Sequence, residues 1–164
     1  MEMLYFAYGS NMNLGQMEFR CPDAKVVQNV RLENYRLAFG GRNPNSGVAT
    51  ILPEKGSHVD GVMWLITGDC ERRLDRYEGY PHLYGKELHD VTGKDGKSYA
   101  VMVYVMKEPY KDFPAIPSGF YLNGILEGCE QNNLSITPVM EAVYQTQKEV
   151  KARNAGKKKE GKER

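Results

Sequence analysis

Long hydrophobic runs are missing from this 164-residue sequence. No apolar stretch approaches the roughly 18 residues that a membrane-spanning helix requires. Residues 1–4 place no basic region ahead of an apolar one, as a secretory signal would. We therefore expect neither membrane association nor secretion. The rest of the composition, 41% hydrophobic and 26% charged, is ordinary for a globular protein, and the length predicts one domain with a single core.

Cysteine is scarce, and the three that occur, Cys21, Cys70 and Cys129, lie far apart in the chain. An odd number at such separations predicts neither a disulfide framework nor a CxxC zinc site. The natural interpretation is a reduced, cytoplasmic protein.

Motifs for metals, nucleotides and nucleophilic catalysis are absent as well. The three histidines are not spaced as metal ligands, so no metal is expected. Loops of the GxGxxG and Walker types do not occur, and no serine or cysteine has the sequence context of a nucleophile. Nucleotide cofactors therefore have no support in the sequence.

Charge is balanced overall, with a net value of +1, but it is unevenly distributed. From Lys148 to Arg164 there are eight Lys or Arg residues against three Glu, so the first 147 residues carry a net charge of −4. A mildly acidic body argues against a general nucleic-acid-binding surface. We divide the chain into a domain, residues 1–150, and a basic, disordered tail, residues 151–164. The tail is interpreted as solubilising, with weak contact to RNA or an acidic partner as the alternative.

Apolar periodicity predicts more strands than helices. Gly93 to Gly96 predicts a hairpin turn between the last two strands, and adjacent hairpins favour a mixed, largely antiparallel sheet with helices packed around it. The class is thus α+β, and the sheet can close into a barrel. Strands are expected at 3–8, 26–30, 35–39, 48–52, 59–66, 86–91 and 97–105, and helices at 14–21, 69–79, 118–126 and from 137 onward.

The segment Tyr8, Gly9, Ser10 and Asn11 lies where a buried strand is expected to turn into a helix. Gly9 permits backbone angles that other residues avoid, and the following amides then point outward near a helix N-terminus. Such a group of N–H donors suits a carboxylate or a developing oxyanion. The alternative is an ordinary strand-to-helix turn with an asparagine cap.

Glu78 is the second candidate, because it borders the apolar stripe of a predicted helix and directly precedes Gly79. Partial burial and the helix dipole both raise the pKa of a carboxyl group at a helix C-terminus. A carboxyl group with a raised pKa is what general acid–base catalysis requires. The alternative is a solvated glutamate at a helix end. By the same helical geometry, Asp75 is interpreted as a solvated or structural acid.

Three of the eleven tyrosines, Tyr84, Tyr104 and Tyr121, stand near these features. Their rings can seal a pocket while the phenols line it, although packing in the core is the general alternative for tyrosine.

Together these strings resemble the γ-glutamylcyclotransferase (AIG2-like) family over about residues 3–145. The matches are the segments 5–12, 61–64, 74–79 with Tyr84, 104–106 and 117–122. The resemblance implies a small barrel ringed by helices. It implies cofactor-free release of 5-oxoproline, in which the α-amine of a γ-glutamyl group attacks its own γ-carbonyl.

The resemblance also assigns roles to the candidate residues. It implies that Glu78 is the acid–base catalyst, that residues 8–11 hold the γ-glutamyl group, and that Tyr84, Tyr104 and Tyr121 line the pocket. Ser10 and Asn11 point to the branch that acts on γ-glutamyl amino acids. The sequence departs from many relatives at Gly85, where a basic residue often follows the tyrosine, and in the segment 80–83, so the amine released is left open.

The predicted partner is a small γ-glutamyl substrate, and a homodimer is compatible with the sequence. Alternative interpretations keep the fold but assign a different substrate or a binding function. The substrate can be a γ-glutamyl amine or a biosynthetic γ-glutamyl intermediate, or the pocket can bind a carboxylate ligand without catalysis.

Overall fold

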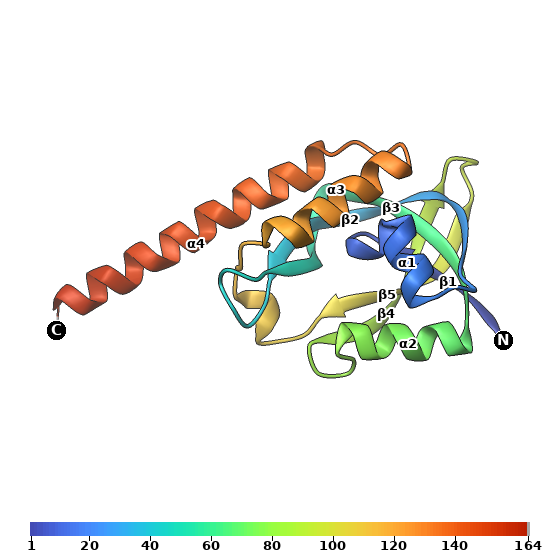
Figure 1. Ribbon diagram of the computed structural model, residues 1–164. Coiled ribbons are helices and arrows are strands. Elements are labelled where there is room, and N and C mark those ends of the chain that lie inside the picture. Colours follow the sequence, from blue (N-terminus) through green and yellow to red (C-terminus); the bar gives the residue numbers. More distant parts are fainter. Residues whose placement is uncertain (164) are drawn as a thin grey trace.

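The fold is a five-stranded closed barrel flanked by helices (Figure 1), which confirms the predicted class. The computed structural model describes the backbone of residues 1–163 and the side chains of residues 1–157. The strand order is β1-β3-β2-β4-β5, with β1 and β5 closing the barrel as a parallel pair and the other neighbours antiparallel. The strands are β1 (Glu2–Ala7), β2 (Lys25–Gly40), β3 (Val48–Thr67), β4 (Tyr84–Gly93) and β5 (Ser98–Met106).

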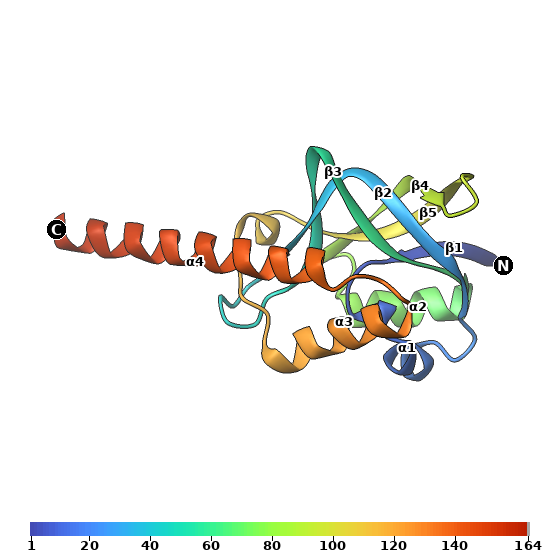
Figure 2. The same ribbon diagram turned by 90° about the horizontal axis from the view of Figure 1, so that it is seen from above.

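Strands β2 and β3 are each continuous, where the sequence predicts two separate strands for each. They form one long hairpin with register shifts between Val26 and Gln28 and between Glu33 and Tyr35. Bulges of this kind bend a strand without ending it, so the polar residues that interrupt the hydrophobic pattern do not break the ladder. Figure 2 shows both strands bent as they form part of the barrel wall.

The helices pack around the barrel and begin at identifiable caps. Asn13 accepts a hydrogen bond from the Gln16 amide at the start of α1, and Ser118 accepts one from the Tyr121 amide at the start of α3, as N-cap residues do. On α4 the side chains of Val139, Val143 and Val150 are buried. The helices are η1 (Ser10–Met12), α1 (Leu14–Arg20), α2 (Gly68–Glu78), η2 (Tyr110–Asp112), α3 (Gly119–Gln131) and α4 (Thr137–Glu163).

Helix α4 continues through the segment for which the sequence predicts a disordered tail. Residues 151–157 are helical and exposed, and the helix extends beyond the body of the protein (Figure 1). The physical reason is that Lys, Arg, Glu and Ala are strong helix formers, and extending an existing helix requires no new nucleation. Arg153 contacts the body through its guanidinium, which lies 4.7 Å from the centroid of the Phe113 ring. Arg164 lies outside the described residues.

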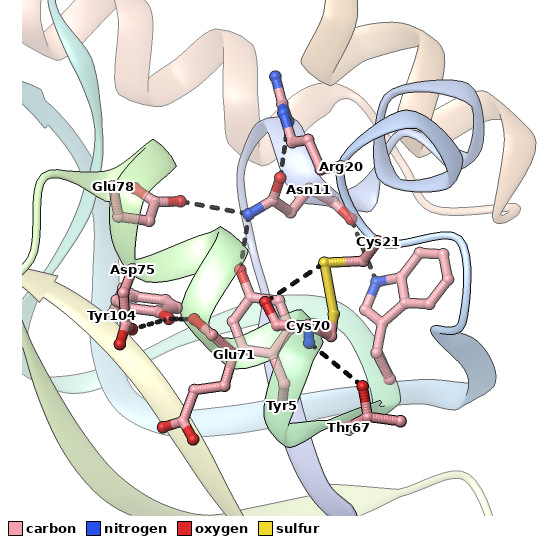
Figure 3. Close-up of a disulfide and its surroundings, with 11 residues drawn as sticks. Tyr5, Asn11, Arg20, Cys21, Thr67, Cys70, Glu71, Asp75, Glu78 and Tyr104 are labelled. Carbon is pink, nitrogen blue, oxygen red and sulfur yellow. Dashed lines mark hydrogen bonds between the residues drawn. A yellow bond between two sulfur atoms is a disulfide. The ribbon is translucent and has the colours of Figure 1, made fainter.

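A disulfide joins Cys21 to Cys70, whose Cα atoms are 5.2 Å apart (Figure 3). The expectation that the cysteines form no disulfide is therefore wrong for this pair. Cys21 directly follows α1 and Cys70 lies in the first turn of α2, so the link holds the two helices together. Cys129 is free and buried. Within residues 1–163, no helix is both long and apolar enough to span a membrane.

Candidate active site

A cavity of about 180 Å³ opens between the end of β1, the end of α2 and the start of α3. Seven elements contribute to its wall, namely β1, η1, β3, α2, β4, β5 and α3. All eight residues predicted from the sequence as catalytic or substrate-binding line it, and so do several that the sequence did not indicate. The wall consists of Tyr5, Tyr8, Gly9, Ser10, Asn11, Val48, Ala49, Tyr77, Glu78, Leu83, Tyr84, Tyr104 and Tyr121.

The segment 8–11 leaves strand β1 and enters the short helix η1 at Ser10. Gly9 has a φ of −123°, so the reason for glycine here is close packing: a Cβ would lie 3.1 Å from the Ala49 Cβ and 3.6 Å from the Tyr121 hydroxyl. The amides of Ser10 and Asn11 have no acceptor among residues 1–157. Two adjacent N–H donors at the cavity wall provide an anion-binding surface.

Glu78 is the last residue of α2, as predicted, and Gly79 ends the helix with a φ of +66°. The left-handed conformation turns the chain away directly after the carboxylate-bearing residue. Burial raises the pKa of Glu78 to about 7, against the opposing effects of the Arg20 charge and of a hydrogen bond from Asn11. A group with this pKa can both accept and donate a proton near neutral pH.

Asn11 connects Glu78 to two residues that the sequence did not indicate (Figure 3). Its Nδ2 donates to Glu78 Oε1 at 3.2 Å and to the Tyr5 hydroxyl at 2.9 Å, and its Oδ1 accepts from Arg20 Nη1 at 2.6 Å. The Arg20 guanidinium stacks 3.6 Å from the Tyr77 ring centroid. Arg20 gave no signal in the sequence because nothing local links the end of α1 to the loop before it. The sequence places Tyr5 in a hydrophobic strand, where the pattern predicts a core residue.

The cavity tyrosines differ in what their hydroxyl groups do. Tyr8 donates to the Tyr104 carbonyl oxygen at 2.6 Å, Tyr84 donates to the Ala49 carbonyl oxygen, and Tyr104 donates to Asp75 Oδ1 at 2.6 Å. Tyr121 instead accepts from the Ala49 amide at 2.9 Å. Burial raises the pKa of each of these phenols, so all of them are neutral at pH 7.

Asp75 is a structural acid, one of the two alternatives left by the sequence. Lys86 on β4 contacts Asp75 and Glu71 through its ammonium group, each at 2.8 Å, and so ties β4 to α2. Lys86 is thereby already paired within the protein. None of the residues that line the cavity in the described chain is a Lys or Arg, so Glu78 is the charged group of its wall.

The raised pKa of Glu78 predicts a stability difference between wild type and Glu78→Gln that depends on pH. The folded-state pKa, about 7, lies above the unfolded value near 4.5, so the folded protein binds the extra proton. The stability that this proton confers is complete below about pH 4.5 and is lost as pH rises through 7. Glutamine does not titrate. The unfolding free energy of the variant, taken relative to that of wild type, should therefore rise by about 2–3 kcal/mol as the pH is raised from 5 to 8.

Denaturant unfolding at both pH values measures this gain, with Glu130→Gln on the exposed face of α3 as the matched control. The same difference in unfolding free energy at pH 5 and at pH 8 would contradict the assignment of a raised pKa.

A small closed barrel with one buried carboxyl group of raised pKa, set among tyrosines, is an arrangement suited to acid–base catalysis. The protein family described as "Gamma-glutamyl cyclotransferase, AIG2-like" matches this chain over residues 5–123. The chain belongs to this family.

Individual relatives agree with that assignment. The γ-glutamylcyclotransferase of Bos taurus is 32% identical over 142 residues, which cover 81% of this chain and 73% of the relative, and that of Homo sapiens is 31% identical over 140 residues with the same coverage. A solved structure of a γ-glutamyl cyclotransferase superposes with a TM-score of 0.76 at 29% identity, covering 90% of this chain and 87% of the other.

Proposed function

We propose that the protein is a γ-glutamylcyclotransferase that releases 5-oxoproline and a free amine from a γ-glutamyl compound, with Glu78 as general acid and base. The observation that carries the proposal is a carboxyl group with a pKa of about 7 hydrogen-bonded to the loop that resembles the family's γ-glutamyl-binding segment. Family membership and relatives named as γ-glutamylcyclotransferases support the activity.

The reaction begins with a proton transfer. The α-ammonium group of the substrate, with a pKa of about 8, is mostly protonated at pH 7 and is not nucleophilic. Ionised Glu78 accepts that proton. The free amine then attacks the γ-carbon, forming the ring C–N bond and an oxyanion at the former carbonyl oxygen. Because the attack is intramolecular, the enzyme contributes by holding the substrate in a folded shape.

Collapse of the intermediate returns the proton. The bond between the γ-carbon and the leaving nitrogen breaks as protonated Glu78 donates its proton to that nitrogen and the carbonyl re-forms. Ionised Glu78 then takes the second proton from the ring nitrogen, which leaves the neutral lactam, and passes it to the departing amine, so one residue serves each proton transfer and is regenerated. The substrate's α-carboxylate needs donors, and the cavity wall offers no cation for it. The amides of Ser10 and Asn11 support its placement there, while Tyr8, Tyr84, Tyr104 and Tyr121 enclose the substrate.

Measuring 5-oxoproline release tests the proposal. The panel consists of γ-glutamyl dipeptides, γ-glutamyl-lysine and glutathione, assayed with wild type and Glu78→Gln in parallel. We expect release from γ-glutamyl amino acids that the variant loses. Release from γ-glutamyl amines alone would move the substrate to the alternative class. A folded wild-type protein without activity on any of them would favour the alternatives of an unsampled γ-glutamyl intermediate or a non-catalytic carboxylate-binding role.

Three further expectations stay proposals. They are a cytoplasmic enzyme, a homodimer, and a catalytic domain that ends at residue 150. Lys86 is the basic residue near Tyr84, and it is paired with Glu71 and Asp75. We therefore also propose that Lys86 supports the cavity wall and does not select the leaving group.

A further inference from the structure

The hydroxyl group of Tyr5 occupies a special position in the cavity. Tyr5 lies on β1, its side chain is 3% exposed, and it lines the cavity wall. Its oxygen accepts a hydrogen bond from Asn11 Nδ2 at 2.9 Å. The same nitrogen donates to Glu78 Oε1 at 3.2 Å, so the Tyr5 oxygen and the Glu78 carboxylate flank one atom (Figure 3).

The direction of the hydrogen bond to Tyr5 is imposed by Arg20. A guanidinium group has donors and no acceptor, so the atom of Asn11 that faces Arg20 at 2.6 Å must be the carbonyl oxygen Oδ1. The opposite end of the amide is therefore the NH2 group, which can only donate. Tyr5 must accept from it, and its own phenolic hydrogen is not used in that bond.

That hydrogen has no protein acceptor in the part of the chain that the structure describes. Three other cavity tyrosines, Tyr8, Tyr84 and Tyr104, donate theirs to protein oxygens. Tyr121 also accepts from the protein, but its partner is the Ala49 amide and not a group that contacts Glu78. The Tyr77 hydroxyl pairs with Ser10 Oγ at 3.3 Å. Tyr5 alone among the cavity phenols combines a free hydrogen with a shared partner of the acid–base residue.

We propose that Tyr5 is a second catalytic residue, which donates a hydrogen bond to the substrate's γ-carbonyl oxygen and to the oxyanion that forms from it. The proposal rests on the proposed function, because Glu78 exchanges its proton with the two nitrogens bonded to the γ-carbon, so the carbonyl oxygen of that carbon lies beside it. A carbonyl oxygen and an oxyanion only accept hydrogen bonds, which matches the free hydrogen of Tyr5. Arg20 is then a positioning residue, since it acts through Asn11.

The environment keeps Tyr5 in its donating form. Burial and the neighbouring Glu78 raise the pKa of its phenol well above the usual value of 10. The groups that face Glu78 from the surrounding elements are Arg20 on α1, Asn11, and the neutral phenols of the cavity, namely Tyr8, Tyr84, Tyr104 and Tyr121. Tyr5 therefore stays protonated throughout the working range of the acid–base residue, and it donates a hydrogen bond without transferring the proton.

Tyr5→Phe removes the hydroxyl and keeps the ring. Removal of an oxyanion donor costs roughly 10²–10³-fold in kcat, so we expect kcat and kcat/KM to fall together by about that factor while KM stays within twofold. The rise of kcat/KM with pH should stay near 7, because Glu78 remains in place. Tyr99→Phe is the matched control: it removes a phenol that contacts Asp95 on the surface, and it should retain wild-type rates.

Arg20→Met tests the positioning step independently and guards against misfolding of Tyr5→Phe. Without the guanidinium, Asn11 is free to turn its oxygen toward Tyr5, which then donates to Asn11 instead of to substrate. Measured at pH 9, where Glu78 is ionised in every variant, Arg20→Met should lower kcat in the wild-type background. It should have little further effect when Tyr5 is already Phe.

The outcomes separate the two proposals. Loss of kcat in Tyr5→Phe with a non-additive Arg20→Met supports Tyr5 as the oxyanion donor. A rise in KM with kcat unchanged would place Tyr5 on the bound substrate's carboxylate and overturn this role, as would rates within twofold of wild type. Fully additive effects would also overturn it. A wild-type protein that releases no 5-oxoproline would instead count against the proposed function.

Discussion

Replacement of Glu78 by Gln is expected to lower kcat by roughly 10²–10⁴, the usual contribution of a general acid–base group. Glutamine has nearly the same shape and retains a carbonyl oxygen that can accept from Asn11, so the cavity should keep its geometry. It cannot take the proton from the substrate's α-ammonium group or return one to the leaving nitrogen. The loss should appear in kcat and in kcat/KM alike, with little change in KM.

Steady-state release of 5-oxoproline measures this loss, with Glu130→Gln as a matched control on an exposed helix face. Tryptophan fluorescence reports folding, because Trp64 is buried and its Nε1 donates to the backbone carbonyl oxygen of Asn11 at 3.1 Å. Wild-type rates in Glu78→Gln, with an active wild type, would show that another group carries the proton.

The second large effect is on the pH dependence of kcat/KM, which should fall about tenfold per pH unit below 7. The first step needs ionised Glu78, whose pKa burial raises to about 7. Only about 1% of a group is ionised two units below its pKa, so kcat/KM at pH 5 should be about 100-fold below its value at high pH. Unfolding does not explain the fall, since protonation of Glu78 stabilises the folded state in this range.

Arg20 provides the discriminating variant for this pH profile. Its charge lowers the pKa of Glu78, so Arg20→Gln should move the rise of kcat/KM to higher pH. Arg73→Gln, on the exposed side of α2, should leave the profile unchanged. A profile that is flat between pH 5 and pH 8 in wild type would refute the raised pKa, and equal shifts in both variants would refute the specific action of Arg20.

Local sequence patterns were sufficient to find the loop and the catalytic candidate. Residues 8–11 lie within one strand-to-helix turn, and Glu78 stands beside Gly79, whose positive φ ends the helix. These features depend on hydrogen bonds between residues a few positions apart, which helix and turn chemistry predicts. The caps Asn13 and Ser118 were predictable for the same reason.

The long strands and the end of α4 were less predictable. Bulges let β2 and β3 continue where the hydrophobic alternation stops, because a ladder with its partner compensates for a locally unfavourable residue. The charged segment after residue 150 has the composition of a disordered tail as well as of a good helix former. Because this segment continues a helix already formed over Thr137 to Val150, it is helical.

The sequence by itself therefore determined the family, the class of fold, the loop and the position of Glu78, since each depends on patterns between near neighbours. Only the tertiary structure decided which groups meet. It paired Cys21 with Cys70, brought Arg20 to Asn11, and aligned Asn11 between Tyr5 and Glu78. Such contacts depend on how the closed barrel places its ends and its helices. Hydrogen-bond direction, which distinguishes Tyr5 from the other phenols, exists only once donors and acceptors from distant segments are within 3 Å or so of each other.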